Sequence, residues 1–400
     1  MTSETLARSL AWKVGFAALL AAGMAAGTVI VQVIGVLAPF LIADLGLSRS
    51  QLGLLVTASA GMGAVASLPA GRVTDALGGR RVLAGTFGAA TLGLVTLALA
   101  PSFPWAMGAT LVAGVGNAAC NPSTNKLLAV HLSLGQRGLI TGVKQSGVQV
   151  GYVLAAALLP TGALVLGWRP AVGLAAAVVG AVMTLAYRLI PPDPPSAPPS
   201  PAGAGPYRYT PAIRWLAVYG FLMGAGVAGV VSYLPLYAHE VLGLSVTAAG
   251  GVAAFASLVG VPARIIWSRQ SERVGHFSSP LLLIALLSVV ATLAIWGSAA
   301  AVPLLWVGAF AAGISLLAWN AVGMLAVVAV AETRHTGRAS GLVLFGFLAG
   351  FMSSPVVFGL SVDSTGSYGP GWAGTVLLFV VAAGVARAWR GKSRGWPGGQ

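Results

Sequence analysis

The sequence predicts an all-α membrane protein with twelve transmembrane helices, arranged as two pseudo-symmetric six-helix bundles around a central cavity. Hydrophobic residues make up 57% of the chain and charged residues only 8%, whereas roughly a quarter of a soluble domain is charged. Apolar runs of about 20 residues, the length that crosses a bilayer, recur along the whole chain. The first run, residues 14–43, is too long for a signal-peptide core and is followed by further spans. It is therefore expected to be a membrane helix.

Twelve spans follow from these runs, at residues 14–43, 52–70, 82–100, 105–130, 139–160, 170–187, 215–238, 247–267, 280–298, 304–330, 340–362 and 372–389. Most Lys and Arg residues fall between spans on one side of the membrane, and such an excess marks the cytoplasmic side. We therefore expect a multi-pass protein of the inner or plasma membrane with both termini in the cytoplasm. The net charge of +14 is explained by this orientation, so nucleic acid is not expected as a partner.

A proline-rich segment divides the chain. The stretch "PPDPPSAPPSPAGAGP" at residues 191–206 has eight prolines in 16 residues, a composition that favours extended polyproline geometry and forms a semi-rigid spacer. We expect residues 191–212 to be a cytoplasmic linker. It would join an N-terminal bundle (residues 1–190) to a C-terminal bundle (residues 213–400), each with six spans.

The two halves are related by an internal repeat. When the sequence is shifted by 197 residues, "LGLS" at 45–48 meets "LGLS" at 242–245, and the same register pairs Gly53 with Gly250, Asp75 with Glu272 and Gly78 with Gly275. Further along, a shift of 199 pairs Asn121 with Asn320 and Gly138 with Gly337. The register without gaps indicates a tandem duplication of a six-span unit.

The segment between the second and third spans carries a specific motif. "GRVTDALGGRR" at residues 71–81 fits the pattern G-x-x-x-D-x-x-G-x-R-R at Gly71, Asp75, Gly78, Arg80 and Arg81. In this motif, and in "LAPFLIADLGLSRSQLG" at residues 37–53, the chain resembles the major facilitator superfamily over essentially its whole length. The copy in the second half, "SRQSERVG", is degenerate. The resemblance implies a transporter that works by alternating access between its two halves.

The resemblance also implies a conformational latch, which we define as Gly71, Asp75, Gly78, Arg80 and Arg81 with Glu272 and Arg273 in the second half. Glycine at 71 lets a neighbouring helix approach closely. The Asp75 carboxylate can meet nearby arginines and the positive N-terminus of an adjacent helix. Such contacts would favour the outward-facing state. Anchoring by positive charge is the simpler explanation, but it accounts only for the arginines.

By the same resemblance, the first, fourth, seventh and tenth spans line the cavity. The fourth span carries Asn117, Asn121 and Asn125 on one helical face, because they are spaced by four residues. We expect substrate contacts there, above all at Asn117 and Asn121, and at three further positions on the lining spans: Gln32, Trp319 and Asn320. Asparagines that join helices within lipid are the alternative explanation.

Three cations are expected inside spans, namely Lys126, Lys144 and Arg264. Each costs about 2.5–3.5 kcal/mol at the bilayer centre, so such residues usually have a function. Lys126 can reach the interface by snorkelling, whereas Lys144 lies deeper. Arg264 stands in "VPARIIWSRQSERVG", which resembles the eighth-helix segment of monocarboxylate and oxalate–formate carriers. The resemblance implies that Arg264 receives a substrate carboxylate; a structural brace is the alternative.

No acidic residue is expected in the middle of a span. Buried cations without acids favour an anionic solute, so we expect a secondary transporter for a small organic anion such as a carboxylate. A proton-coupled drug or antibiotic efflux pump is the alternative, followed by a transport-inactive receptor or scaffold. A coupling proton would have to use the solute's own acid group or a lysine.

The expected partners are the small-molecule substrate and the lipid bilayer, and the protein is expected to act as a monomer. The sequence shows no spacing typical of metal ligands, and no cofactor, catalytic residue or enzymatic activity is expected.

Overall fold

The structure is a computed structural model that describes residues 10–47, 49–133, 135–193 and 208–393. These residues form helices and no strand, which confirms the all-α prediction. The first half contains α1 (Leu10–Val36), α2 (Ala38–Leu45), α3 (Arg49–Leu77), α4 (Gly79–Ala98), α5 (Phe103–His131), α6 (Arg137–Leu166) and α7 (Trp168–Leu189). The second half contains α8 (Pro211–Glu240), α9 (Val246–Val274), α10 (Ser278–Gly297), α11 (Pro303–Ile314), α12 (Trp319–Val330), the short 3-10 helix η3 (Thr333–His335), α13 (Thr336–Thr365) and α14 (Gly369–Ser393).

The helix boundaries follow the internal repeat. Helices α3 and α9 both have 29 residues, α4 and α10 both have 20, and α6 and α13 both have 30. The starts of α3 and α9 differ by 197 positions, and those of the other two pairs differ by 199. The offsets are those at which the sequence repeats.

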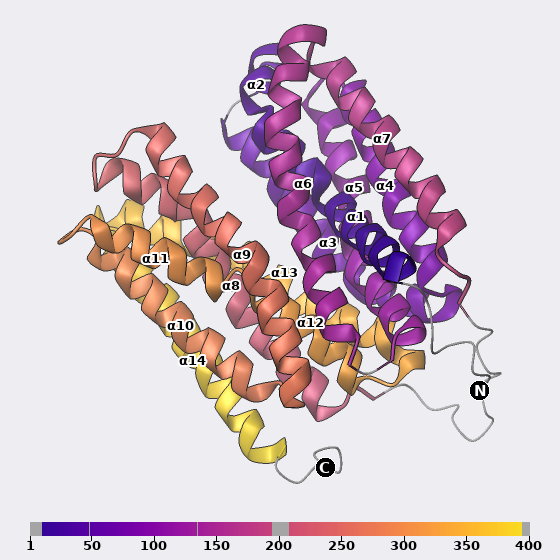
Figure 1. The fold of residues 1–400 in the computed structure, drawn as a ribbon. Helices are drawn as coiled ribbons and strands as arrows, with labels where there is room; N and C mark the ends of the chain where they lie inside the picture. Colours follow the sequence, from indigo (N-terminus) through magenta and orange to yellow (C-terminus); the bar gives the residue numbers. More distant parts are fainter. Residues whose placement is uncertain (1–9, 48, 134, 194–207, 394–400) are drawn as a thin grey trace.

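The two halves form separate helical bundles that pack side by side (Figure 1). Across their interface α3 packs on α13 and α6 packs on α9. Because α9 is the repeat mate of α3 and α13 is the repeat mate of α6, the two contacts are related by the pseudo-symmetry of the halves. We call the end of the bundles that holds residues 191–193 and 208–210 the linker end, and the opposite end, where α2 lies, the far end. In Figure 1 the bundles approach each other at the linker end and diverge toward the far end.

Eleven segments of the described residues are long and apolar enough to cross a membrane. One of them, residues 303–330, combines α11 and α12. The twelfth span is α5, which is 29 residues long but carries three asparagines and Lys126. A twelve-helix transporter fold therefore fits the structure, and the span with the asparagines and Lys126 is one that the sequence predicts to line the cavity.

Two predicted spans are interrupted. The run at 14–43 is divided at Leu37 into α1 and α2, and Pro39 lies at the start of α2. Proline is favoured there because the first helical positions need no backbone N–H donor. The run at 304–330 is divided at residues 315–318 into α11 and α12. Broken helices within a membrane need partners for the freed backbone groups, and these are described below.

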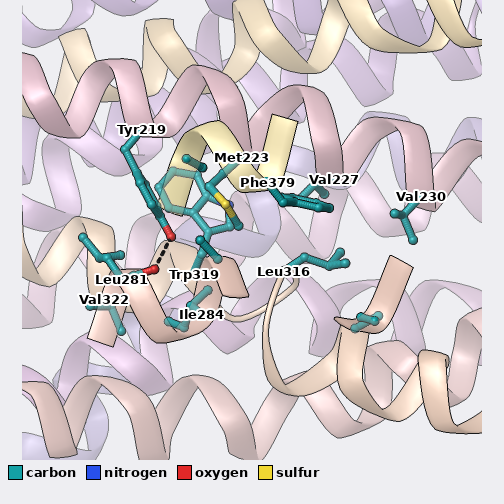
Figure 2. Packing of buried hydrophobic residues seen from close by; sticks show 14 of the residues in the cluster. Tyr219, Met223, Val227, Val230, Leu281, Ile284, Leu316, Trp319, Val322 and Phe379 are labelled. Carbon is teal, nitrogen blue, oxygen red and sulfur yellow. Dashed lines mark hydrogen bonds between the residues drawn. The ribbon is translucent and has the colours of Figure 1, made fainter. Parts of the chain in front are cut away.

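Each half has its own hydrophobic core. The largest buried cluster lies within the second half, where Tyr219, Met223, Trp319 and Phe379 pack together (Figure 2). The hydroxyl of Tyr219 donates to the Leu281 carbonyl oxygen at 2.8 Å, which gives this buried hydroxyl a partner. The main clusters of the first half lie among α1–α7, and one of them also includes Val328 of α12. A small further cluster joins Ala64 of α3 to Leu344 and Leu348 of α13. The largest cores thus lie within single halves, which suits rigid-body movement of two bundles.

The predicted linker at residues 191–212 falls largely outside the described residues, because its central part, 194–207, is not described. The domain boundaries at 190 and 213 therefore stay a prediction. Asp193 is described, and its Oδ2 accepts a hydrogen bond from the backbone N–H of Arg80 at 3.0 Å. The first residues of the linker thus bind the start of α4 within the first half.

Candidate functional site: a buried polar interface between the two halves

The Asp75 carboxylate joins the two halves at the linker end. It lies at the end of α3 and accepts hydrogen bonds from the backbone N–H groups of Gly337 at 2.8 Å and Arg338 at 2.9 Å. These groups belong to the first turn of α13, where unpaired N–H groups and the helix dipole favour an anion. Lys126 Nζ lies 3.4 Å from Asp75 Oδ1, and the two side chains are 9% and 6% exposed. The Asp75 carboxylate therefore forms a nearly buried ion pair with Lys126 and caps the N-terminus of α13.

The glycines of the motif permit this contact. A Cβ atom on Gly71 would lie 2.5 Å from the carbonyl oxygen of Gly337, and a Cβ on Gly337 would lie 2.5 Å from that of Gly71. Real Cβ atoms do not approach a carbonyl oxygen so closely, so α3 and α13 can come this near to each other only because positions 71 and 337 are both glycine. Small residues allow such backbone contact between membrane helices.

A second contact repeats the first with the halves exchanged. Glu272 lies near the end of α9, and its Oε1 accepts hydrogen bonds from the backbone N–H groups of Gly135 at 3.0 Å and Arg137 at 2.9 Å, at the start of α6. A Cβ on Gly138 would lie 2.7 Å from the Ser268 carbonyl oxygen. Helices α6 and α13 are repeat mates, as are Asp75 and Glu272. The degenerate second copy of the motif therefore keeps the acid and the close helix approach.

The other motif residues do not join the halves. Gly78 has a positive φ of 86°, and a Cβ there would overlap the Asp193 carboxylate. The Arg80 guanidinium lies 4.2 Å from the ring centroid of Tyr187, on α7 of the same half. Arg81 and Arg273 are exposed. We attribute the contact between the halves to Gly71, Asp75 and Glu272; that they act as a latch stays a prediction.

Lys144 lies in α6 at the interface of the halves and is fully buried. Its Nζ donates to the hydroxyl of Thr124 at 2.7 Å and to the side-chain oxygen of Asn125. The side-chain amide of Asn125 in turn donates to the Ser340 hydroxyl, 2.8 Å away on α13 of the other half. Among the described residues no carboxylate pairs with Lys144.

Arg264 lies in α9 and is 5% exposed. Its Nε donates to the carbonyl oxygen of Leu317 at 2.8 Å, and Nη1 donates to that of Gln145 at 3.1 Å. Leu317 stands in the break between α11 and α12, where Trp267 Nε1 also donates to the Ile314 carbonyl at 2.7 Å. Arg264 therefore supports the broken span and bridges the halves. Two of its five N–H donors are used by these carbonyls, and its charge has no acidic partner in the described chain.

The asparagine row of α5 runs along this interface. Asn121 is 7% exposed, and its side-chain oxygen accepts from Gln145 Nε2 at 3.0 Å. Asn125 is fully buried in the contact with Lys144, and Asn117 is half-buried one helical turn before Asn121. The row and the two cations thus form one polar cluster, which we call the interface cluster: Asn117, Asn121, Thr124, Asn125, Lys144, Gln145 and Arg264.

The remaining predicted site residues lie in other surroundings. Gln32 Nε2 donates to Thr28 at 3.0 Å and to the Val148 carbonyl at 2.9 Å, and its side chain lines an apolar groove of about 720 Å³ among α1, α6, α7 and α9. Trp319 is 1% exposed in the core of the second half, where its ring packs on Tyr219 and Phe347 (Figure 2). Asn320 is half-buried at the start of α12. Packing accounts for Trp319, and we leave Trp319 and Gln32 out of the interface cluster.

Several participants were missed by reasoning from the sequence. Lys126 was expected either to snorkel or to function, but no partner was assigned; the structure pairs it with Asp75 across 51 positions and with the Thr333 carbonyl at 2.7 Å. Gln145 and Ser340 were not singled out. Their only sequence signal is position, since Gln145 follows Lys144 and Ser340 is the first residue of the predicted span 340–362.

Comparison with known proteins agrees with the fold. The model of the Major Facilitator Superfamily matches residues 14–300. Because the match covers well over half of the chain, the protein belongs to this superfamily of membrane transporters. The resemblance read from the motif is thereby confirmed.

Individual relatives are more distant. The chain is 26% identical over 370 residues to a protein of Cupriavidus necator described as the probable sulfoacetate transporter SauU, with 84% of each chain covered. Among solved structures, the human organic anion transporter MFSD10 superimposes with a TM-score of 0.76 at 15% identity, covering 94% of this chain and 99% of that one. The transporter FucP in its outward conformation gives 0.74 at 16% identity, covering 94% and 98%. At these identities the structural likeness shows the fold.

Proposed function

We propose that this transporter carries a small organic anion and that the anion binds at the interface cluster. The observation that carries the proposal is the pair of buried basic side chains, Lys144 and Arg264, neither of which has a carboxylate partner in the described chain. A buried charge without a counter-ion costs several kcal/mol. An anion that enters between the halves would supply the missing negative charge, and its oxygens would accept hydrogen bonds from the N–H groups that have no partner among the described residues.

The solute in the description of the relative SauU, sulfoacetate, supports a small acid as the substrate. Sulfoacetate has one sulfonate and one carboxylate, and the interface cluster offers two basic side chains without acidic partners in the described chain, the Arg264 guanidinium and the Lys144 amine. A guanidinium binds a carboxylate or sulfonate at two points, whereas an ammonium acts as a point charge. The asparagine side chains can donate to the same oxygens. We therefore propose a small acid of this kind, carrying one or two negative charges, as the substrate.

Alternating access follows from the arrangement of contacts. The hydrogen bonds of Asp75 and Glu272 join the two halves at the linker end in this structure. We propose that the linker end faces the cytoplasm, in agreement with the distribution of Lys and Arg, so that the protein is outward-facing here. Inward opening would separate α3 from α13 and α6 from α9, and would expose the interface cluster to the cytoplasm.

Binding to the purified full-length protein tests the proposal. Each acid is paired with its neutral analogue: acetate with acetamide, and methanesulfonate with methanesulfonamide, with sulfoacetate added to the set. We expect the wild type to bind acids at least tenfold more tightly than their neutral analogues. Arg264→Lys keeps the charge but loses two-point contact and should weaken acid binding by about tenfold or more, the equivalent of about 1.4 kcal/mol.

A matched substitution separates a local from a general effect. Arg169→Lys changes an arginine that pairs with Asp44 at 2.8 Å at the far end of the first half. It should leave acid binding unchanged. If the wild type binds acids and neutral analogues equally well, the anion proposal is wrong, and the drug-efflux alternative gains support.

A further inference from the structure

The chain contains two buried lysines in opposite electrostatic situations. Lys126 pairs with the Asp75 carboxylate at 3.4 Å, so its charge is balanced. Lys144 is fully buried, and its two hydrogen-bond partners, Thr124 and Asn125, are both neutral. An ammonium has three N–H donors, whereas an uncharged amine has two. The observed hydrogen bonds match the donors of an uncharged amine.

The surroundings of Lys144 supply no counter-ion within the described residues. Helix α5 presents Cys120, a buried thiol, and α9 presents Arg264, a second cation. Glu272, the acid that α9 directs toward α6, is bonded to backbone N–H groups at the start of α6. Helix α12 has no ionisable residue, α1 has none after Lys13, and the charged residues of α7 and α13 stand near their ends (α7: Arg169 and Arg188; α13: Arg338 and Asp363).

A proton on Lys144 would therefore be a second buried charge, besides that of Arg264, without an acidic partner in the described chain. Proteins avoid a buried charge by pairing it or by neutralising the group. Arg264 cannot be neutralised, because guanidinium keeps its proton in proteins. Lys144 can be neutralised, and a bound anion next to it would reverse the balance by supplying an opposite charge.

We propose that Lys144 carries the coupling proton of this transporter: its amine is uncharged in the anion-free state and takes up one proton from solvent when an anion binds. The new N–H bond provides the third donor, which is directed to the anion, while Thr124 and Asn125 keep the other two. When the anion leaves on the opposite side, Lys144 returns the proton to solvent there. Anion and proton thus move together, and Arg264 supplies the permanent charge. The inference rests on the proposed anion site.

Because binding energies are reciprocal, an anion that promotes protonation must itself bind more tightly at low pH. Calorimetric titration of the full-length protein with sulfoacetate, in buffers with different ionisation enthalpies, measures the number of protons taken up. Both acid groups of sulfoacetate are ionised above about pH 6, so it brings no proton of its own. We expect uptake approaching one proton per bound anion, and an affinity that falls by up to tenfold per pH unit as the pH rises.

Two variants assign the proton to Lys144. Lys144→Arg places a permanent charge at this position and should bind sulfoacetate with no proton uptake and no pH dependence. Lys144→Gln should also take up no proton and should bind more weakly. Cys120→Ser removes the other ionisable group on α5 near Lys144, and its uptake should equal that of the wild type.

The outcomes separate this inference from the proposed function. Sulfoacetate binding by the wild type without proton uptake would overturn the inference and leave the anion site intact. Proton uptake that persists in Lys144→Gln, or that disappears in Cys120→Ser, would overturn the assignment to Lys144. Failure of the wild type to bind any acid would overturn the anion site, and the proton inference with it. The wild-type measurement decides whether anion binding takes up a proton even if a Lys144 variant does not fold.

Discussion

Replacing Asp75 with asparagine removes a negative charge from the contact between α3 and α13 while keeping the size of the side chain. In the closed linker end, Asp75 accepts from the N–H groups of Gly337 and Arg338 and pairs with Lys126. In the opened state the same groups would be exposed to water, where the loss of the charge costs little. The substitution should therefore destabilise the closed linker end selectively.

The magnitude follows from burial. Removing one partner of a buried ion pair costs about 3–5 kcal/mol, and the contact between Asp75 and Lys126 qualifies because the side chains are 6% and 9% exposed. Asparagine keeps one acceptor oxygen for the N-terminus of α13, so we take the lower value, about 3 kcal/mol. At 1.4 kcal/mol per factor of ten this is about a hundredfold change. It would bring a 99:1 preference for the closed linker end close to equal populations.

Distances between spin labels measure this shift. A Cys120→Ser background removes the single native thiol. One label pair at Arg188 and His276 reports on the linker end, and another at Leu166 and Val302 reports on the far end; all four positions are exposed. For Asp75→Asn we expect longer distances at the linker end, shorter ones at the far end and slower transport cycling. Substrate affinity should stay within a few-fold.

Asp44→Asn is the matched control. Asp44 is also a carboxylate of the first half, but its partners, Arg169 and Trp168, belong to the same half. Its distance distributions should equal those of the wild type. If Asp75→Asn also leaves both distributions and the transport rate unchanged, the latch interpretation is wrong.

Two further predictions concern the second contact and the linker. Glu272→Gln should shift the label distances in the same direction as Asp75→Asn, but the populations of the two states should change by only about tenfold, because Glu272 caps α6 without a buried lysine partner. A shift as large as that of Asp75→Asn would show that the ion pair with Lys126 does not make the Asp75 contact the stronger of the two. Deletion of residues 196–202 should leave transport at the wild-type rate, since a proline-rich spacer is expected to make no packing contact; loss of transport by a folded deletion variant would show that the segment binds elsewhere.

Much of the fold could be predicted from the sequence because each membrane helix is encoded locally. Apolar runs gave the twelve spans, and the repeat placed α9 and α13 in register with α3 and α6. The break at residues 315–318 could not be predicted. Its freed carbonyls depend on donors from α9, Arg264 and Trp267, about 50 positions earlier in the chain. No local pattern in "GISLLAWN" marks the interruption.

The candidate site was predictable in part. Lys144 and Arg264 stand out as charges inside apolar runs, since such residues are rare and costly there. Their partners are uncharged and distant in sequence, as in the bond of Arg264 to the Gln145 carbonyl. The pairing of Lys126 with Asp75 also depends on how α3 and α5 pack. Packing likewise explains why Trp319, the neighbour of Asn320 in sequence, belongs to the core.

Transport of labelled sulfoacetate into proteoliposomes tests the central claim, that this chain moves small organic anions through the interface cluster. Wild-type protein and Arg264→Lys are reconstituted at equal density, and uptake is measured with and without excess acetate, methanesulfonate or acetamide. We predict saturable uptake by the wild type that is reduced by the acids, unaffected by acetamide, and at least tenfold slower in Arg264→Lys. Uptake no greater than in protein-free vesicles, or equal inhibition by acetamide and acetate, would contradict the claim.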